Sequence, residues 1–119
     1  MNSEVAAYLN LQPEPQKSVL EGMYQVVMKA IPDTEDVISY GIVGFKYKNK
    51  VPFFISGWKS HVSIHGGRVL GKRAHEVVPS IKVIGTTLQI DPAKPLSEAE
   101  LRALIKLRLE IFDESGGRQ

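Results

Sequence analysis

Residues 36–65, DVISYGIVGFKYKNKVPFFISGWKSHVSIH, decide the fold class of this chain. The stretch is rich in aromatic and β-branched residues, which favour the pleated, half-buried surface of a sheet. Residues typical of turns interrupt it at positions 40–41, 48–50 and 58–60. The sequence therefore predicts four short strands, over about residues 36–40, 43–48, 51–57 and 60–65.

Side chains in the second of these strands alternate in character. Phe45 and Tyr47 alternate with Lys46, Lys48 and Lys50. Neighbouring side chains of a strand point to opposite faces of the sheet. We therefore expect the aromatic side chains to face a core and the lysines to face solvent.

Helical patterns flank the predicted strands. A short helix is expected over residues 3–10, and a longer one starts near Pro13 or Pro15 and ends at Pro32. Ser97 and Glu100 form a capping-box pattern that opens a last helix, over about 97–113. Between them the sequence predicts a short helix at 69–77 and strands at 82–84 and 86–90. This order predicts an α+β two-layer sandwich, an antiparallel sheet with the N- and C-terminal helices on one face.

Length and composition limit the possible classes of protein. The 119 residues predict a single domain over 1–119, with a disordered tail at 114–119. The chain has no cysteine, which excludes disulfides and thiolate chemistry. No apolar run approaches the ~20 residues that span a bilayer, and the N-terminus lacks the basic segment of a signal peptide. We therefore expect a cytoplasmic protein that is not bound to a membrane.

Five short motifs carry a family resemblance. They are VISYG at 37–41, FKY at 45–47, WKSHV at 58–62, GTTL at 85–88 and KPL at 94–96. These motifs resemble, in order and spacing, the pattern VISYGMPAFKY, FKNHIGFY, KGTIRFP and KPLP of the YdhG-like family of small bacterial domains. The resemblance covers about residues 13–112, which is nearly the whole chain.

The resemblance implies both a fold and a function. YdhG-like domains are likened to frataxin in fold, and part of the family is associated with an iron-chaperone role. For this chain that would mean weak, transferable binding of ferrous iron and its delivery to iron–sulfur or haem assembly proteins. The chain departs from the family pattern at Val43, which replaces a proline, and at His65-Gly66, which replaces Tyr-Pro. Leu88-Gln89-Ile90 also lacks the arginine of an Ile-Arg-Phe segment, and this loss could alter what the sheet face binds.

Carboxylates are the candidate ligands for such an iron. Ferrous iron held for transfer should be bound by oxygen ligands with open positions for exchange. Asp33, Glu35 and Asp36 lie together between the long helix and the first strand, and Glu14 and Glu21 could extend the site along the helix. The alternative is that residues 32–36 form a solvated turn whose aspartates bind loop amides.

A binding module that uses the sheet face is the alternative function. Its candidate residues are Tyr40, Trp58, Lys59 and His61, and its ligand would be a small molecule or a protein. His61 and His65 share one face of a strand, but four residues of strand span ~13 Å, too far for one shared metal ion. The sequence carries no recognisable catalytic motif, so we expect a protein that is not an enzyme.

Nucleic-acid binding is a third hypothesis, based on lysines 46, 48 and 50 and the basic residues at 68, 72 and 73. The net charge of only +2 and the inward direction of the aromatic side chains argue against it. Lysines also protect edge strands from aggregation, which explains them more simply. Near the C-terminus, Arg108 falls where the apolar stripe of the last helix continues, and we expect it to extend to solvent or to pair with an acid.

Overall fold

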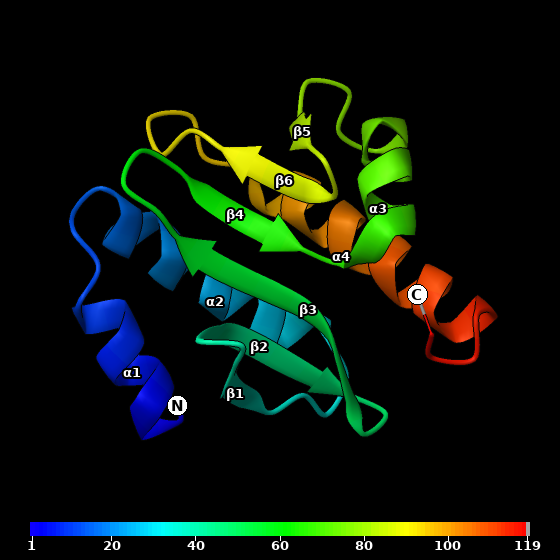
Figure 1. Cartoon of the computed structure of the whole chain (residues 1–119), viewed down its shortest axis with the longest axis horizontal. Coiled ribbons are helices and arrows are strands. Elements are labelled where there is room, and N and C mark those ends of the chain that lie inside the picture. Colours follow the sequence, from blue (N-terminus) through cyan, green and yellow to red (C-terminus); the bar gives the residue numbers. More distant parts are fainter. Residues whose placement is uncertain (119) are drawn as a thin grey trace.

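Six antiparallel strands form one sheet in the computed structural model, which describes residues 1–118 (Figure 1). The strands are β1 (Asp36–Ser39), β2 (Ile42–Tyr47), β3 (Lys50–Gly57), β4 (Val62–His65), β5 (Lys82–Ile84) and β6 (Thr87–Ile90). Their order in the sheet is β1-β2-β3-β4-β6-β5. The helices are α1 (Ser3–Asn10), α2 (Gln16–Ala30), α3 (Gly67–Arg73) and α4 (Glu98–Glu114), with a 3-10 turn, η1 (Ala74–Glu76), after α3.

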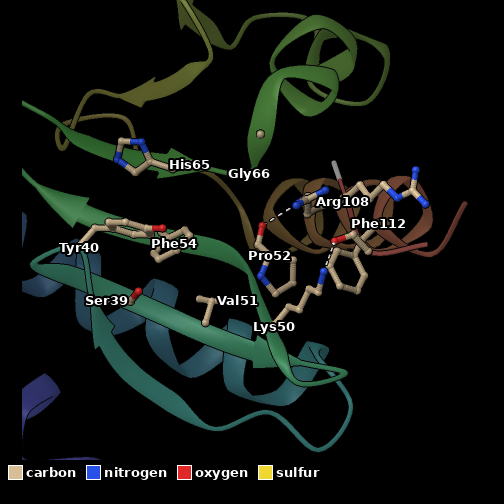
Figure 2. A pocket seen from close by; sticks show the side chains of 13 residues that line it. Ser39, Tyr40, Lys50, Val51, Pro52, Phe54, His65, Gly66, Arg108 and Phe112 are labelled. Carbon is tan, nitrogen blue, oxygen red and sulfur yellow. Dashed lines mark hydrogen bonds between the residues drawn. The ribbon is translucent and has the colours of Figure 1, made fainter. Parts of the chain in front are cut away.

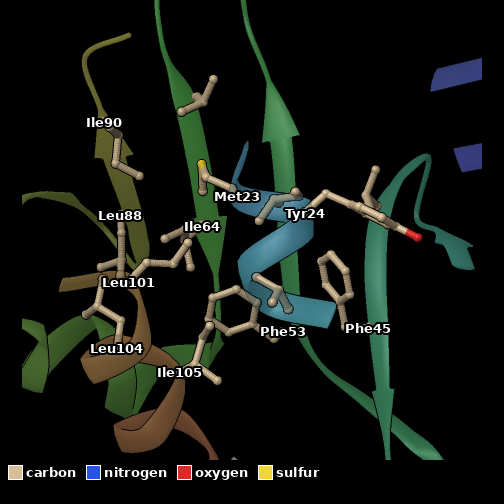
Figure 3. Close-up of a cluster of buried hydrophobic side chains, with 14 of the residues drawn as sticks. Met23, Tyr24, Phe45, Phe53, Ile64, Leu88, Ile90, Leu101, Leu104 and Ile105 are labelled. Atoms are coloured by element: carbon tan, nitrogen blue, oxygen red, sulfur yellow. The ribbon is translucent and has the colours of Figure 1, made fainter. Parts of the chain in front are cut away.

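Helices α2 and α4 pack against each other on one face of the sheet, behind the strands in Figure 1. Helix α1 contacts β1, β2 and α2, and α3 packs on α4 and β6. The core lies between the α2–α4 layer and the strands, and Figure 3 shows part of it. The predicted α+β sandwich, with its helices on one face of an antiparallel sheet, is confirmed.

The register of the strands separates the two faces of the sheet. Phe45 pairs with Phe53, and a row of aliphatic residues from Val43 to Leu88 follows on the same face, toward the helices. Phe45 and Phe53 are fully buried, as the period of two predicts. The opposite, open face carries a second row, in which Gly44, Phe54, His65 and Thr87 are successive partners.

The helix ends follow local sequence signals. Ser97 accepts a hydrogen bond from the amide of Glu100 at 3.1 Å, and the Glu100 carboxylate accepts from the amide of Ser97 at 2.9 Å. This capping box confirms the predicted start of α4. Helix α2 ends at Ala30, two residues before Pro32, because a proline cannot continue the hydrogen bonding of a helix.

Strand β4 begins at Val62, two residues later than predicted. Residues 58–61 form a turn instead, closed by the Trp58 amide, which donates to the His61 carbonyl at 2.9 Å. The side-chain amide of Gln16 donates to the carbonyls of Trp58 and Lys59, at 2.8 Å each. These bonds from α2 hold residues 58–61 out of the sheet.

Arg108 points inward and not to solvent. Its side chain is buried, its Nε donates to the Pro52 carbonyl at 2.6 Å, and its guanidinium lies 5.6 Å from the centre of the Phe112 ring. Pro52 lies beyond the last residue of β3 that pairs with β4, and the arginine binds its carbonyl there. The expected pairing with an acid is thus replaced, at Nε, by a backbone carbonyl.

The C-terminal tail, for which the sequence predicts disorder, closes α4 with hydrogen bonds up to residue 118. The Gly117 amide donates to the Phe112 carbonyl at 2.8 Å, and Lys50 Nζ donates to the Gly117 carbonyl at 3.2 Å. Gln119 lies outside the described residues. Within residues 1–118, no helix has the length and apolar character needed to cross a membrane.

Candidate functional site: a groove on the open sheet face

The acids expected to bind iron are engaged in local structure. Asp36 Oδ2 accepts hydrogen bonds from the Tyr24 hydroxyl at 2.8 Å and from the Asn2 amide at 2.9 Å. Glu35 is exposed and lies 3.9 Å from the ammonium of Lys46. Asp33 is exposed and has a left-handed φ of 51° just after α2. The three residues lie close in sequence, but Asp36 points its carboxylate into a hydrogen-bonded junction.

Glu14 and Glu21 do not extend those acids into a cluster. Glu14 lies before the first residue of α2 and accepts from the amide and the hydroxyl of Ser18, both at 3.0 Å. The Ser18 hydrogen bonds lower the pKa of Glu14. Glu21 is an exposed residue of α2. Among residues 1–118, no three histidine, aspartate or glutamate side chains are arranged so that they could hold one metal ion.

The four residues predicted for the sheet-face site lie apart. Tyr40 lines a groove at one end of the open face, whereas His61 lines a separate cavity, of about 530 Å³, with residues of β5 and β6. Lys59 is exposed in the turn after β3. Trp58 stacks on His61, with ring centres 6.3 Å apart and ring planes 20° apart. Of the four, Tyr40 belongs to the site described next.

The groove has a volume of about 560 Å³, within the ordinary range for small-ligand sites. It is lined by residues from the β1–β2 turn, β3, the end of β4 and the end of α4: Ser39, Tyr40, Lys50, Val51, Pro52, Phe54, His65, Gly66, Gly67, Arg108, Phe112, Gly117 and Arg118. Figure 2 shows the rings of Tyr40, Phe54 and His65 on one side of it, and Lys50, Arg108 and Phe112 on the other.

The aromatic side of the groove depends on a glycine. A Cβ atom at Gly44 would lie 2.6 Å from Val51 Cγ1 and 3.1 Å from the Phe54 ring, so the ring rests on bare backbone. The Tyr40 ring lies over Phe54, with ring centres 6.0 Å apart. Tyr40 is 93% exposed and has a left-handed φ of 55°, at the turn that it forms with Gly41. An exposed aromatic residue in a conformation that suits asparagine or glycine is typical of a functional position.

The charged residues of the groove are all basic. Lys50, Arg108 and Arg118 line it, and none of the thirteen lining residues, all of them in the described part of the chain, is an aspartate or a glutamate. Burial lowers the pKa of Arg108 to about 10, which still leaves the guanidinium protonated at neutral pH. This basic lining favours an anion.

A hydrogen-bonded chain on the open face ends at the groove. The indole N–H of Trp58 donates to Ser56 Oγ at 2.8 Å, and Ser56 Oγ lies 2.9 Å from Nε2 of His65. Burial lowers the pKa of His65, so the ring is neutral at neutral pH. Ser56 is fully buried in the middle of β3.

Sequence reasoning missed most of these residues. The alternation in β3 and β4 places Phe54, Ser56 and His65 on one face, and the hairpin register would have made Ser56 and His65 diagonal neighbours. That signal was available in principle. Lys50 and Arg118 meet only because α4 ends beside the start of β3, and no local spacing indicates this.

Comparisons with known proteins identify the fold. No family profile matches the chain, and no curated protein sequence matches it. The structure is similar to the crystal structure of YdhG, a DUF1801-family protein from Bacillus subtilis, with a TM-score of 0.79. The two sequences are 14% identical, and the match covers 95% of this chain and 94% of that chain. The fold predicted from the YdhG-like resemblance is confirmed, whereas function has to be argued from the site.

Proposed function

We propose that this protein is a non-catalytic binding module, and that the groove on its open sheet face holds a small ligand with a flat apolar part and an anionic group. The proposal rests on how aromatic and basic side chains are distributed around the groove. The rings of Tyr40 and Phe54 line one side of it. Basic side chains line the other side together with Phe112, and no acid is among the lining residues.

The aromatic side suits a flat partner. Phe54 presents ring surface to the groove from β3, and Tyr40 does so from the β1–β2 turn. The absence of a side chain at Gly44 lets the Phe54 ring lie against the backbone. Offset or edge contacts between aromatic rings contribute about 0.5–1.5 kcal/mol beyond the burial of area. The exposed Tyr40 ring would lose water contact when a ligand binds, which adds a hydrophobic contribution.

The basic side suits a carboxylate, sulfonate or phosphate group. Lys50 is exposed at the groove. Within residues 1–118 its ammonium makes one hydrogen bond, to the Gly117 carbonyl at 3.2 Å, which leaves donors for a ligand. Arg118 is also exposed there. An anion between these side chains would form charge-assisted hydrogen bonds.

Iron delivery, the function implied by the family resemblance, has less support from the side chains. A transferable iron site needs several oxygen ligands that converge on one point. The Asp36 carboxylate accepts hydrogen bonds from Tyr24 and Asn2, and the Glu14 carboxylate accepts from Ser18. Asp33, Glu35 and Glu21 are the acids left for such a role, which remains a hypothesis with its own test below.

A fluorescence titration with anilinonaphthalene sulfonate, a flat aromatic anion, tests the proposed function. We expect saturable binding to one site that weakens as salt is added, because added ions screen the basic side chains. N-phenylnaphthylamine, which lacks the sulfonate, should bind less tightly. Lys50→Gln should weaken binding of the sulfonate about three- to tenfold, as expected for one partly exposed charge.

The matched control is Lys46→Gln. Lys46 is also an exposed lysine of the same sheet, but it does not line the groove. This variant should bind the sulfonate as the wild type does. Equal losses in Lys50→Gln and Lys46→Gln would indicate diffuse attraction to a positive surface, and absence of saturation would remove the groove as a binding site.

A further inference from the structure

The hydrogen bonds that join Trp58, Ser56 and His65 determine which ring nitrogen of His65 carries the proton. An indole N–H can only donate, so Ser56 Oγ is an acceptor toward Trp58. The hydroxyl hydrogen of Ser56 then needs an acceptor of its own, because Ser56 is fully buried and a buried O–H without a partner is destabilising. Nε2 of His65, 2.9 Å away, is the acceptor that the described residues provide.

An acceptor Nε2 carries no proton. A neutral imidazole has one N–H, so the proton of His65 is on Nδ1. Within residues 1–118, the buried side-chain polar atoms without a hydrogen bond belong to Gln16, Thr34 and Ser63. Nδ1 of His65 is not among them. His65 is half-buried and lines the groove, and Nδ1 is therefore not enclosed by the protein.

We infer that His65 determines which ligands the groove accepts, because its Nδ1–H is oriented by Ser56 and Trp58 to donate a hydrogen bond to a ligand oxygen. The preferred ligand carries a carboxylate, sulfonate or phosphate oxygen at this point. A ligand that presents only an N–H donor there meets a second donor and is rejected. This inference rests on the proposed function, since it assigns a role within the same groove.

The arrangement explains why a donor at His65 complements the rest of the site. Phe54 is the direct cross-strand partner of His65, so a flat ligand in contact with the Phe54 side chain lies near the imidazole. Lys50 lies on the other side of the groove and supplies the positive charge. The charge of Lys50 attracts an anion without fixing its orientation, whereas the N–H of His65 orients the anion by a directional hydrogen bond.

The first measurement is the tautomer of His65, read from long-range proton–nitrogen NMR spectra of the whole chain at neutral pH. We expect the Nδ1–H form in the wild type. Ser56→Ala removes the hydroxyl donor, so His65 should shift toward the Nε2–H form and present an acceptor to the groove. The ratio of affinities for anilinonaphthalene sulfonate and N-phenylnaphthylamine should then fall about three- to tenfold.

Ser63→Ala is the matched control. Ser63 is the cross-strand partner of Ser56, is also fully buried, and its Oγ has no hydrogen bond among the described residues. It should keep both the tautomer and the affinity ratio of the wild type. Because both variants lose one buried hydroxyl from the same face, a general effect on the sheet would appear in both.

The outcomes separate this inference from the proposed function. An Nε2–H form in the wild type overturns the inference, and so does a Ser56→Ala variant with an unchanged affinity ratio, even if the sulfonate binds. Failure of the sulfonate to bind the wild type overturns the proposed function and, with it, the role of His65 toward ligands. The tautomer would still report whether Ser56 orients the ring.

Discussion

The hydroxyl of Tyr24 donates a hydrogen bond of 2.8 Å to the carboxylate of Asp36, joining α2 to the first residue of β1. The Asn2 amide donates to the same oxygen at 2.9 Å, so the N-terminal segment is joined at this point too. Burial, followed by the hydrogen bond to Asp36 and its charge, raises the pKa of Tyr24 to about 12. An aspartate that appears from sequence to be a free metal ligand therefore connects three segments of the fold.

Replacing Asp36 should destabilise the protein. In Asp36→Ala, the hydroxyl of the buried Tyr24 loses its acceptor, and we expect the free energy of unfolding to fall by about 1–3 kcal/mol. Urea denaturation measures this loss. Adding Tyr24→Phe should recover part of it, because the effects of substitutions at two contacting residues on stability are not additive. Glu35→Ala, at the weak exposed ion pair with Lys46, should change stability by less than about 0.5 kcal/mol. Losses of equal size in the two alanine variants would contradict this role for Asp36.

The iron hypothesis is best tested without disturbing Asp36. The double variant Asp33→Asn with Glu35→Gln removes two exposed carboxylates and keeps the junction at Tyr24 intact. In an anaerobic calorimetric titration with ferrous iron, using magnesium as the control ion, we expect the wild type and the double variant to give the same heats. Saturable iron binding that is present in the wild type and lost in the double variant would support the iron-chaperone hypothesis.

The sequence predicted the layers of the fold because their signals are local. Alternation around Phe45 fixed which strand face is buried, and Ser97 with Glu100 fixed the start of α4. The direction of the Asp36 carboxylate could not be predicted, because its partner Tyr24 lies twelve residues away on another element. The groove was missed for the same reason, since Tyr40 and Arg118 line it from positions far apart in the sequence.

Two glycines should respond oppositely to alanine. In Gly44→Ala the new methyl group would collide with Val51 and the Phe54 ring, and we expect a loss of about 1–3 kcal/mol in the free energy of unfolding. Gly22 is exposed in the interior of α2, with no atom within 4 Å of its would-be Cβ. Gly22→Ala should therefore stabilise the protein by about 0.5–1 kcal/mol.

Urea denaturation of both glycine variants checks this pair, and the sulfonate titration adds a second readout. Only Gly44→Ala displaces the Phe54 ring, so only this variant should bind the sulfonate more weakly. A Gly44→Ala protein with wild-type stability and wild-type affinity would show that the ring does not depend on the bare backbone beneath it.

Tyr40 should show a conflict between stability and binding. Its left-handed φ of 55° is unfavourable for tyrosine and suits asparagine, particularly before Gly41 in a two-residue turn. Tyr40→Asn should therefore raise the free energy of unfolding by up to about 1 kcal/mol and at the same time weaken binding of the sulfonate. A variant that is both less stable and equally able to bind would indicate that Tyr40 supports the turn and not the ligand.

The buried imidazole of His65 should make stability depend on pH. Burial lowers the pKa of His65 in the folded protein below its ordinary value near 6.5. Above that ordinary value the ring is neutral in both the folded and the unfolded chain, and its contribution to stability is complete. As the pH falls below it, the unfolded chain binds a proton first, so the free energy of unfolding decreases until the pH passes the lowered pKa.

His65→Gln removes this titration, so the variant should lose less stability than the wild type when the pH is lowered from 7.5 to 5.5. Urea denaturation at the two pH values measures the difference, and NMR titration of the His65 ring in the wild type locates its pKa directly. Protonation would also turn Nε2 into a donor and remove the acceptor for the Ser56 hydroxyl, which acts in the same direction as burial. An equal loss in the wild type and in His65→Gln would show that the pH dependence arises elsewhere and that the Ser56–His65 bond does not favour the neutral ring.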